Sequence, residues 1–257
     1  MPLISNQYLS DIESEIKASE ALEMPKLSTA ASSDIGRVRP TNEDAFFYSE
    51  DQGLWVVADG MGGLNRGDRA SKAVVDNLRS FERLENLAEN IKDLETRLIL
   101  ANTSCRTMFR RNVIGTTVVS FLAFEQYGLF LWAGDSRIYR LRDRALEQIT
   151  QDHNLVQEKV VRGDLTAEEA EKDPSANVLT RAVGIHEDLR IEMQHAQLLP
   201  GDRYLLCSDG LYRDLSHSEI EELLTLGSTE EAVNQLIDLA LERGGADNIT
   251  AMVVELC

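Results

Sequence analysis

Five aspartates stand where apolar runs of the sequence stop or start, and glycine or asparagine accompanies most of them. They are Asp44 before "AFFY", Asp59 after "LWVVA", Asp135 after "LFLWAG", Asp209 after "YLLCS" and Asp247 before "NITAMVVEL". Such apolar runs are typical of buried strands, and a neighbouring glycine permits a turn or the close approach of a ligand. A single Asp-Gly pair is usually only a turn. Five such aspartates on five predicted strands instead indicate a shared site.

Carboxylates that converge in one site repel one another unless cations lie among them. A set of oxygen ligands without His or Cys is typical of hard divalent ions such as Mg²⁺ or Mn²⁺. A water molecule that bridges two such ions can act as a nucleophile at neutral pH. If the five aspartates converge, they therefore predict a divalent metal site with hydrolytic chemistry.

Clusters of short strands are interleaved with pairs of amphipathic helices along the chain, and these elements must position the carboxylates. We expect strands at 44–49, 53–59, 115–124, 127–134, 137–142, 189–196, 202–208 and 248–255. We expect helices at 68–81, 87–108, 216–226 and 229–243. Most neighbouring strands are joined by short turns, which favours antiparallel pairing. The pattern predicts an α+β fold in which two sheets pack together and helices cover them, in one domain.

Two segments carry weaker core patterns. Residues 1–27 form an N-terminal extension, which we expect to be mobile or loosely docked, and the domain is expected to cover 28–257. Ser10 and Glu13 have the spacing of a capping box for a short helix there. The segment 152–184 is polar, helical in pattern and interrupted twice. Thr166 and Glu169 predict a short helix within it.

Composition excludes several classes of function. A formal net charge of -18 argues against a nucleic-acid or anionic-membrane surface, which requires basic patches. Three cysteines give no disulfide framework and favour a reducing compartment. No apolar stretch approaches the roughly 20 residues of a membrane helix, and the start of the chain does not resemble a signal peptide. We expect a cytoplasmic protein.

Six motifs occur in the order found in the PP2C-type (PPM) protein serine/threonine phosphatases, and the chain resembles their bacterial branch from about 28 to 256. They are "RPTNEDAF" at 39–46, "VADGMGG" at 57–63, "GTT" at 115–117, "AGDSRIYRL" at 133–141, "SDGL" at 208–211 and "DNIT" at 247–250. The resemblance implies a four-layer αββα sandwich, with two central antiparallel sheets flanked by helices. It also implies metal-dependent hydrolysis of phosphoserine and phosphothreonine in proteins. The segment 152–184 corresponds to a flap beside the metal site.

The resemblance also implies two Mn²⁺ or Mg²⁺ ions, with a third as an open alternative. One ion is held by Asp59, Asp209 and Asp247. The other is held by Asp59 and the Gly60 carbonyl. Asp59 thus bridges the two ions and the water or hydroxide that attacks phosphorus, without a covalent enzyme intermediate.

Several further roles follow from the resemblance and leave alternatives open. Asp44 and Glu43 act largely through water, although Glu43 could simply be exposed to solvent. Asp135 contributes to the third, weaker metal site, or is a turn residue between two strands. Arg37 and Arg39 are two residues apart, so on a strand they would share a face and either could bind phosphate. The motif selects Arg39.

The general acid is left unassigned. Many eukaryotic members carry a histidine where this chain has Met61, and methionine cannot donate a proton. Only His153 among the histidines lies in a motif, and we interpret it as structural.

The sequence leaves two functions other than a protein phosphatase open. A metal-dependent hydrolase of other phosphoesters would use the same carboxylates. A non-catalytic phosphoprotein-binding module is disfavoured because the carboxylate set is intact. The expected partners are phosphorylated proteins, either a serine/threonine kinase or its targets, and the chain is expected to be a monomer.

Overall fold

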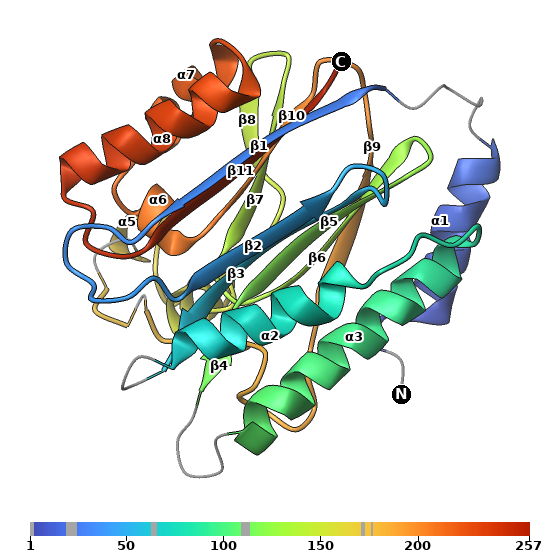
Figure 1. Cartoon of the computed structure of the whole chain (residues 1–257), viewed down its shortest axis with the longest axis horizontal. Coiled ribbons are helices and arrows are strands. Elements are labelled where there is room, and N and C mark those ends of the chain that lie inside the picture. Colours follow the sequence, from blue (N-terminus) through green and yellow to red (C-terminus); the bar gives the residue numbers. More distant parts are fainter. Residues whose placement is uncertain (1–2, 19–24, 63–65, 109–113, 171–172, 176) are drawn as a thin grey trace.

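A computed structural model describes residues 3–18, 25–62, 66–108, 114–170, 173–175 and 177–257 (Figure 1). Within these ranges, two antiparallel sheets form the centre of the molecule. One has the order β1 (Leu27–Asp34), β11 (Ile249–Leu256), β10 (Arg203–Cys207), β7 (Arg137–Arg142) and β8 (Ala145–Gln148). The other has the order β2 (Asp44–Ser49), β3 (Leu54–Met61), β5 (Val118–Phe124), β6 (Tyr127–Ala133) and β9 (Glu192–Gln197), and β4 (Gly115–Thr116) pairs with β3.

Helices cover the outer face of each sheet. The β2–β9 sheet carries α2 (Gly67–Arg79) and α3 (Leu87–Met108), whereas α7 (His217–Thr225) and α8 (Thr229–Arg243) lie on the other sheet (Figure 1). The shorter helices are α4 (Leu155–Val161), α5 (Ala167–Ala170) and α6 (Asp209–Tyr212). The predicted four-layer αββα sandwich is confirmed.

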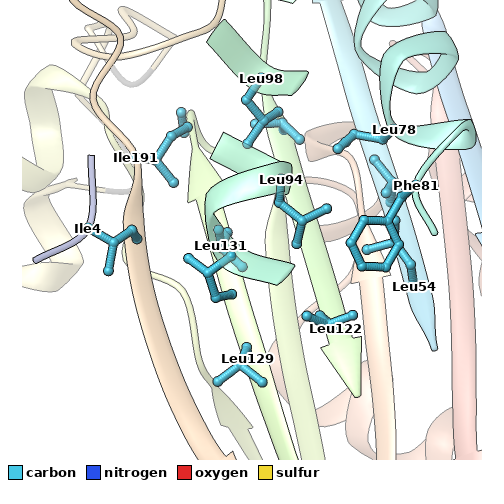
Figure 2. Close-up of a cluster of buried hydrophobic side chains, with 14 of the residues drawn as sticks. Ile4, Leu54, Leu78, Phe81, Leu94, Leu98, Leu122, Leu129, Leu131 and Ile191 are labelled. Atoms are coloured by element: carbon cyan, nitrogen blue, oxygen red, sulfur yellow. The ribbon is translucent and has the colours of Figure 1, made fainter. Parts of the chain in front are cut away.

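Strand β3 is apolar on both faces because both faces are covered. Trp55 and Val57 belong to the core between the two sheets, whereas Leu54 and Val56 face the helices. Alternate side chains of a strand point to opposite faces, so a strand covered on both sides needs a continuous apolar run. Figure 2 shows the core under the helices, where Leu94 of α3 faces side chains from the sheet.

Two strands were not expected from the sequence. Strand β1 contains mostly small and polar residues, and it forms because it pairs along its length with β11, from Leu27 opposite Leu256 to Asp34 opposite Ile249. Strand β8 is short and pairs with β7. The strand expected at 115–124 is divided into β4 and β5, with Thr117 between them.

Within residues 3–18, the N-terminal extension forms a helix that contacts the domain. Helix α1 (Asn6–Ala18) buries Leu9 and Ile12, and the Tyr8 hydroxyl lies 2.9 Å from Nδ1 of His195 on β9. The capping box expected at Ser10 is wrong. The helix begins earlier, and the Tyr8 N–H donates instead to the hydroxyl of Ser5. Apolar residues spaced along one face dock the helix, although they are few in the sequence.

The predicted capping box in the segment 152–184 is confirmed. The Glu169 N–H donates to the Thr166 hydroxyl, and the Thr166 N–H donates to the Glu169 carboxylate. Helix α4 starts after Asn154, whose side chain accepts a hydrogen bond from the Gln157 N–H. No helix in the described ranges combines the length and apolar character needed to cross a membrane.

Candidate active site

The predicted carboxylates converge at one end of the two sheets. Asp44 lies directly opposite Asp59 in the β2–β3 pairing, while Asp209 follows β10 and Asp247 precedes β11. Burial raises the pKa of Asp59 well above its usual value, and the charges of Asp44, Asp209, Asp135 and Asp247 raise it further. The five side chains therefore act on one another in one site, as the sequence predicted.

Asp44 joins the two sheets. Its Oδ2 accepts hydrogen bonds from the hydroxyls of Ser208 (2.7 Å), which follows β10, and Thr250 (2.6 Å) on β11 of the opposite sheet. Its Oδ1 is buried and has no hydrogen-bond partner among the described residues. Burial raises the pKa of this carboxyl to about 7 despite the two hydroxyl donors. Ser208 and Thr250 were missed from sequence, although both lie inside quoted motifs.

The "GTT" motif fixes the backbone of Asp59. The Asp59 N–H donates to the Thr117 hydroxyl at 2.9 Å, and the Asp59 carbonyl accepts from the Thr117 N–H at 2.8 Å. The Thr116 hydroxyl donates to the same carbonyl at 2.9 Å. Because the backbone groups of Asp59 are bonded within the protein, its carboxylate is held toward the cavity.

Position 60 requires glycine because there is no room for a side chain. A Cβ at this position would lie 2.2 Å from the carbonyl oxygen of Gly67 and 2.6 Å from that of Glu43. Strand β3 and the start of α2 therefore approach each other more closely than a side chain would allow.

Glu43 is not simply exposed to solvent, so that alternative is wrong. Its Oε1 accepts a hydrogen bond from the Gly67 N–H at 2.9 Å, at the first residue of α2. A carboxylate at a helix N-terminus is stabilised by the free N–H groups there. The contact through water to a metal ion stays a prediction.

Arg39 and Arg37 lie in a turn after β1 and make different contacts. Arg39 Nη2 donates to Asp247 Oδ2 at 2.6 Å, and its side chain is 52% exposed. Arg37 Nε donates to the carbonyl of Leu241, away from the carboxylates. The structure brings Arg39 to the site and leaves Arg37 outside it, because the turn separates two residues that would share a face on a strand.

Asn248 holds the loop that carries Arg39. Its side-chain oxygen accepts from the Glu43 N–H at 2.8 Å, and its Nδ2 donates to the carbonyls of Ile35 (2.9 Å) and Thr41 (3.0 Å). The side chain of Asn248 therefore bonds to both ends of this loop, and its backbone N–H donates to Asp247 Oδ1 at 2.9 Å.

Arg213 is a site residue that the sequence analysis missed. Its Nη2 lies 2.7 Å from Asp209 Oδ2 and 3.5 Å from Asp135 Oδ2. Burial and the Asp209 charge raise the pKa of Asp135 to about 8, whereas Arg213 lowers it. The available signal was the spacing of four residues between Asp209 and Arg213, which places both on one face of a helix.

His153 makes structural contacts. Its ring stacks on Trp132 with centroids 5.9 Å apart, and Nδ1 accepts from the Gly134 N–H at 3.2 Å. This agrees with the interpretation made from sequence. Met61 lines the cavity over the carboxylates, so a thioether that cannot donate a proton occupies the position where many eukaryotic members have a histidine.

A cavity of roughly 390 Å³ opens over the carboxylates. The charged residues that line it include Asp59, Asp135, Asp209, Asp247, Arg39 and Arg213. Asn177 and Leu179 of the flap segment 152–184 also line it. The cavity therefore combines anionic side chains, which attract cations, with arginines that can bind an anionic group.

The donors around this cavity suit hard divalent cations. Asp44 Oδ1 and Asp209 Oδ1 are buried without a hydrogen-bond partner in the described part of the chain, and a buried carboxylate oxygen of this kind is costly unless a cation or water binds it. The described residues contain no ready-made group of three His, Cys, Asp or Glu ligands. The ion pairs of Asp247 with Arg39 and of Asp209 with Arg213 engage two of the carboxylates. The oxygen donors fit metal binding, provided that the exposed Arg39 moves.

Comparison with known proteins gives a family match over most of the chain. The family described as Protein phosphatase 2C matches residues 37–252. The serine/threonine protein phosphatase PstP of Mycobacterium tuberculosis is 37% identical over 236 residues. That match covers 90% of this chain and 45% of PstP, so the chain spans about half the length of this relative.

Solved structures agree with the sequence match. PppA of Pseudomonas aeruginosa has a TM-score of 0.85 and 40% identity, covering 92% of this chain and all (100%) of that one. The catalytic domain of PstP in complex with 2 manganese ions has a TM-score of 0.80 and 35% identity, covering 89% of this chain and 97% of that one.

Proposed function

The chain belongs to the protein phosphatase 2C family, and from this premise we propose that it is a metal-dependent enzyme that hydrolyses phosphoserine and phosphothreonine in proteins. One observation carries the proposal. Asp59, Asp135, Asp209 and Asp247 line one cavity together with Arg39, and Asp44 lies opposite Asp59 in the β2–β3 pairing. Among the described residues, one buried oxygen each of Asp44 and Asp209 has no hydrogen-bond partner. The similarity to a PstP catalytic domain with manganese bound supports the same cofactor here.

The metal ligands are proposed as follows. Asp59, Asp209 and Asp247 hold one Mn²⁺ or Mg²⁺, and Asp59 with the Gly60 carbonyl holds the other. Asp44 and Glu43 support them through water. When bound, two such ions supply Lewis acidity and an activated water for attack on phosphorus.

The protein's own residues prepare this chemistry. The threonines of the "GTT" motif hold Asp59 by its backbone, and Ser208 and Thr250 hold one oxygen of Asp44. Because these groups are fixed before substrate arrives, little reorganisation is needed in the reaction.

Arg39 is the proposed phosphate-binding residue. Its guanidinium is exposed, lines the cavity and is anchored to a loop that Asn248 holds. Its guanidinium donates to Asp247 Oδ2 at 2.6 Å, and a phosphoryl group would offer the same guanidinium a bidentate acceptor.

The biological setting is also proposed. The substrates are phosphoproteins, either the targets of a serine/threonine kinase or the kinase itself, and the enzyme acts as a monomer. A cytoplasmic location is supported by Cys105, Cys207 and Cys257, which are all free thiols in the structure.

The test is release of inorganic phosphate from a phosphothreonine peptide by the purified chain. We expect EDTA to abolish release and Mn²⁺ to restore it. Small phosphate metabolites, assayed in parallel, should be poorer substrates, because they lack the polypeptide that would contact the cavity rim and the flap. Full activity of the metal-free protein would overturn the metal dependence. Release from small metabolites alone would instead identify a hydrolase of other phosphoesters.

A further inference from the structure

Arg213 lies within ion-pair distance of two acidic side chains of the site. Its Nη2 is 2.7 Å from Asp209 Oδ2 and 3.5 Å from Asp135 Oδ2. The family resemblance alone would place a third cation beside Asp135. We propose that the guanidinium of Arg213 takes the place of this third cation, so that the chain binds two metal ions in the site. This inference rests on the proposed metal-dependent function.

The position of Arg213 is set by helix α6. Arg213 follows Asp209 by four residues, and its N–H donates to the Asp209 carbonyl at 3.0 Å. The hydroxyl of Tyr212 donates to the carbonyl of Asp135 at 2.9 Å, which joins the helix to the turn that carries Asp135. Leu211 and Leu215 are buried beneath it. The short helix is therefore anchored on both sides of Arg213, and the guanidinium is directed at the two carboxylates.

A second arginine reinforces this anchoring. The guanidinium of Arg137 lies over the ring of Tyr212, 3.6 Å from its centroid, and makes two hydrogen bonds to Asp152. Tyr212 is thus held between its hydrogen bond to Asp135 and the Arg137 stack. Movement of Arg213 away from Asp135 would need either a side-chain rotation against two charges or the loss of these contacts.

Arg213 leaves Asp209 free to bind a metal ion. Oδ2 of Asp209 faces the guanidinium, whereas Oδ1 is buried without a hydrogen-bond partner among the described residues. One carboxylate can therefore serve Arg213 and a cation at once. Asp135 is more deeply buried: its side chain is 5% exposed, and its carboxylate forms an ion pair with Arg213.

The charges are balanced without a third ion. When Glu43 and the five aspartates are ionised, their charge is matched by that of Arg39, Arg213 and two divalent ions. A third divalent ion would have to enter beside a guanidinium that stays protonated at any accessible pH. Two positive charges in contact repel each other strongly in a partly buried site.

The experiment measures how many Mn²⁺ ions each folded chain binds, by equilibrium dialysis with elemental analysis. We expect two for the wild type, three for Arg213→Gln and two for Arg213→Lys, which keeps the charge. Arg144→Gln is the matched control, because Arg144 is exposed in the β7–β8 turn. It removes one positive charge elsewhere and should leave the number at two, so it corrects for weak binding to the acidic surface.

Three ions in the wild type, or two in a folded Arg213→Gln protein, would overturn the proposal. If Arg213→Gln does not fold, Asp135→Asn decides. Its ion count should equal that of the wild type, and a fall by one ion would show that Asp135 already holds a metal. Phosphate release from the phosphothreonine peptide is measured separately. A chain that binds two ions and hydrolyses no phosphopeptide would contradict the proposed function and not the role of Arg213.

Discussion

Asp202 and Asp209 flank the two ends of the same strand, β10, and their surroundings are opposite. Asp202 is 1% exposed and accepts from Arg142 on both oxygens, at 2.7 and 2.6 Å, with Leu199 N–H and the Tyr204 hydroxyl as further donors. Asp209 has a pKa raised chiefly by burial, and its Oδ1 has no hydrogen-bond partner in the described ranges. A buried carboxylate whose two oxygens both accept hydrogen bonds within the protein is structural. A buried carboxylate that keeps an oxygen without a donor, among other carboxylates, is a candidate ligand-binding group.

Removal of the Asp209 charge should have the largest effect on activity. Asp209→Asn should lower phosphatase activity by more than about 100-fold, since metal ions contribute several kcal/mol to catalysis and an amide is a weaker ligand. The free energy of unfolding should change much less than in Asp202→Asn, because loss of the ion pair with Arg213 is offset by relief of the repulsion within the cluster. Phosphate release and urea unfolding of the metal-free protein measure the two effects. A variant that is both unfolded and inactive would show that Asp209 is structural after all.

The same substitution at the other end should do the reverse. Asp202→Asn breaks a buried ion pair, so the free energy of unfolding should fall by about 3–5 kcal/mol. The phosphatase activity of each folded molecule should be unchanged, because Asp202 makes no contact with the cavity. Denaturant unfolding and assays well below the melting temperature separate stability from activity. A large loss of activity in the folded fraction would contradict the contrast between the two ends.

Stabilisation by bound metal ions should also differ between the Asp202 and Asp209 variants. Saturating Mn²⁺, at 100 times its dissociation constant, should stabilise the wild type by about 2.7 kcal/mol for each site, or roughly 5–10 °C in melting temperature. Asp202→Asn should keep this increase from its lower starting point, and Asp209→Asn should lose most of it. Thermal melts with EDTA and with Mn²⁺ give the comparison. Equal increases in all three proteins would place the metal ions elsewhere.

Arg39 and Arg37 offer a smaller contrast beside the cavity. Arg39→Ala should lower kcat/KM for a phosphopeptide about 10- to 100-fold, since a hydrogen bond to a charged group contributes roughly 1.5–3 kcal/mol. Arg37 is the matched control, because its side chain donates to the Leu241 carbonyl and does not line the cavity. Arg37→Ala should change kcat/KM little. Equal losses in both variants would contradict the assignment of Arg39 as the phosphate-binding residue.

The flap segment 152–184 should give the smallest effect on the chemistry itself. Replacing residues 163–174 with a short Gly/Ser linker should reduce activity on a phosphoprotein more than activity on p-nitrophenyl phosphate. The reason is that Asn177 and Leu179 line the cavity, whereas the carboxylates come from the two sheets. Steady-state kinetics on both substrates measure this. Equal losses would mean that the flap supports the carboxylate cluster, and unchanged kinetics would indicate a passive surface segment.

Much of the fold could be read from local patterns. The expected helix 229–243 and strand 137–142 match α8 and β7, because amphipathic spacing and alternation depend on neighbouring residues. Strand β1 could not be read in this way. Its sequence "LSTAASSD" has no apolar alternation, and it becomes a strand because β11 offers it a complete set of backbone partners.

The site shows the same division. The order and the residue types of the motifs predicted which aspartates lie together and that Arg39 lies beside them. The tertiary structure decided how each one is held. It set Ser208 and Thr250 against Asp44 across the two sheets, seated Arg213 between Asp135 and Asp209, and docked α1 against His195. These contacts join residues far apart in the chain or depend on the placement of a short helix. They follow from sheet packing and strand register, which no local pattern specifies.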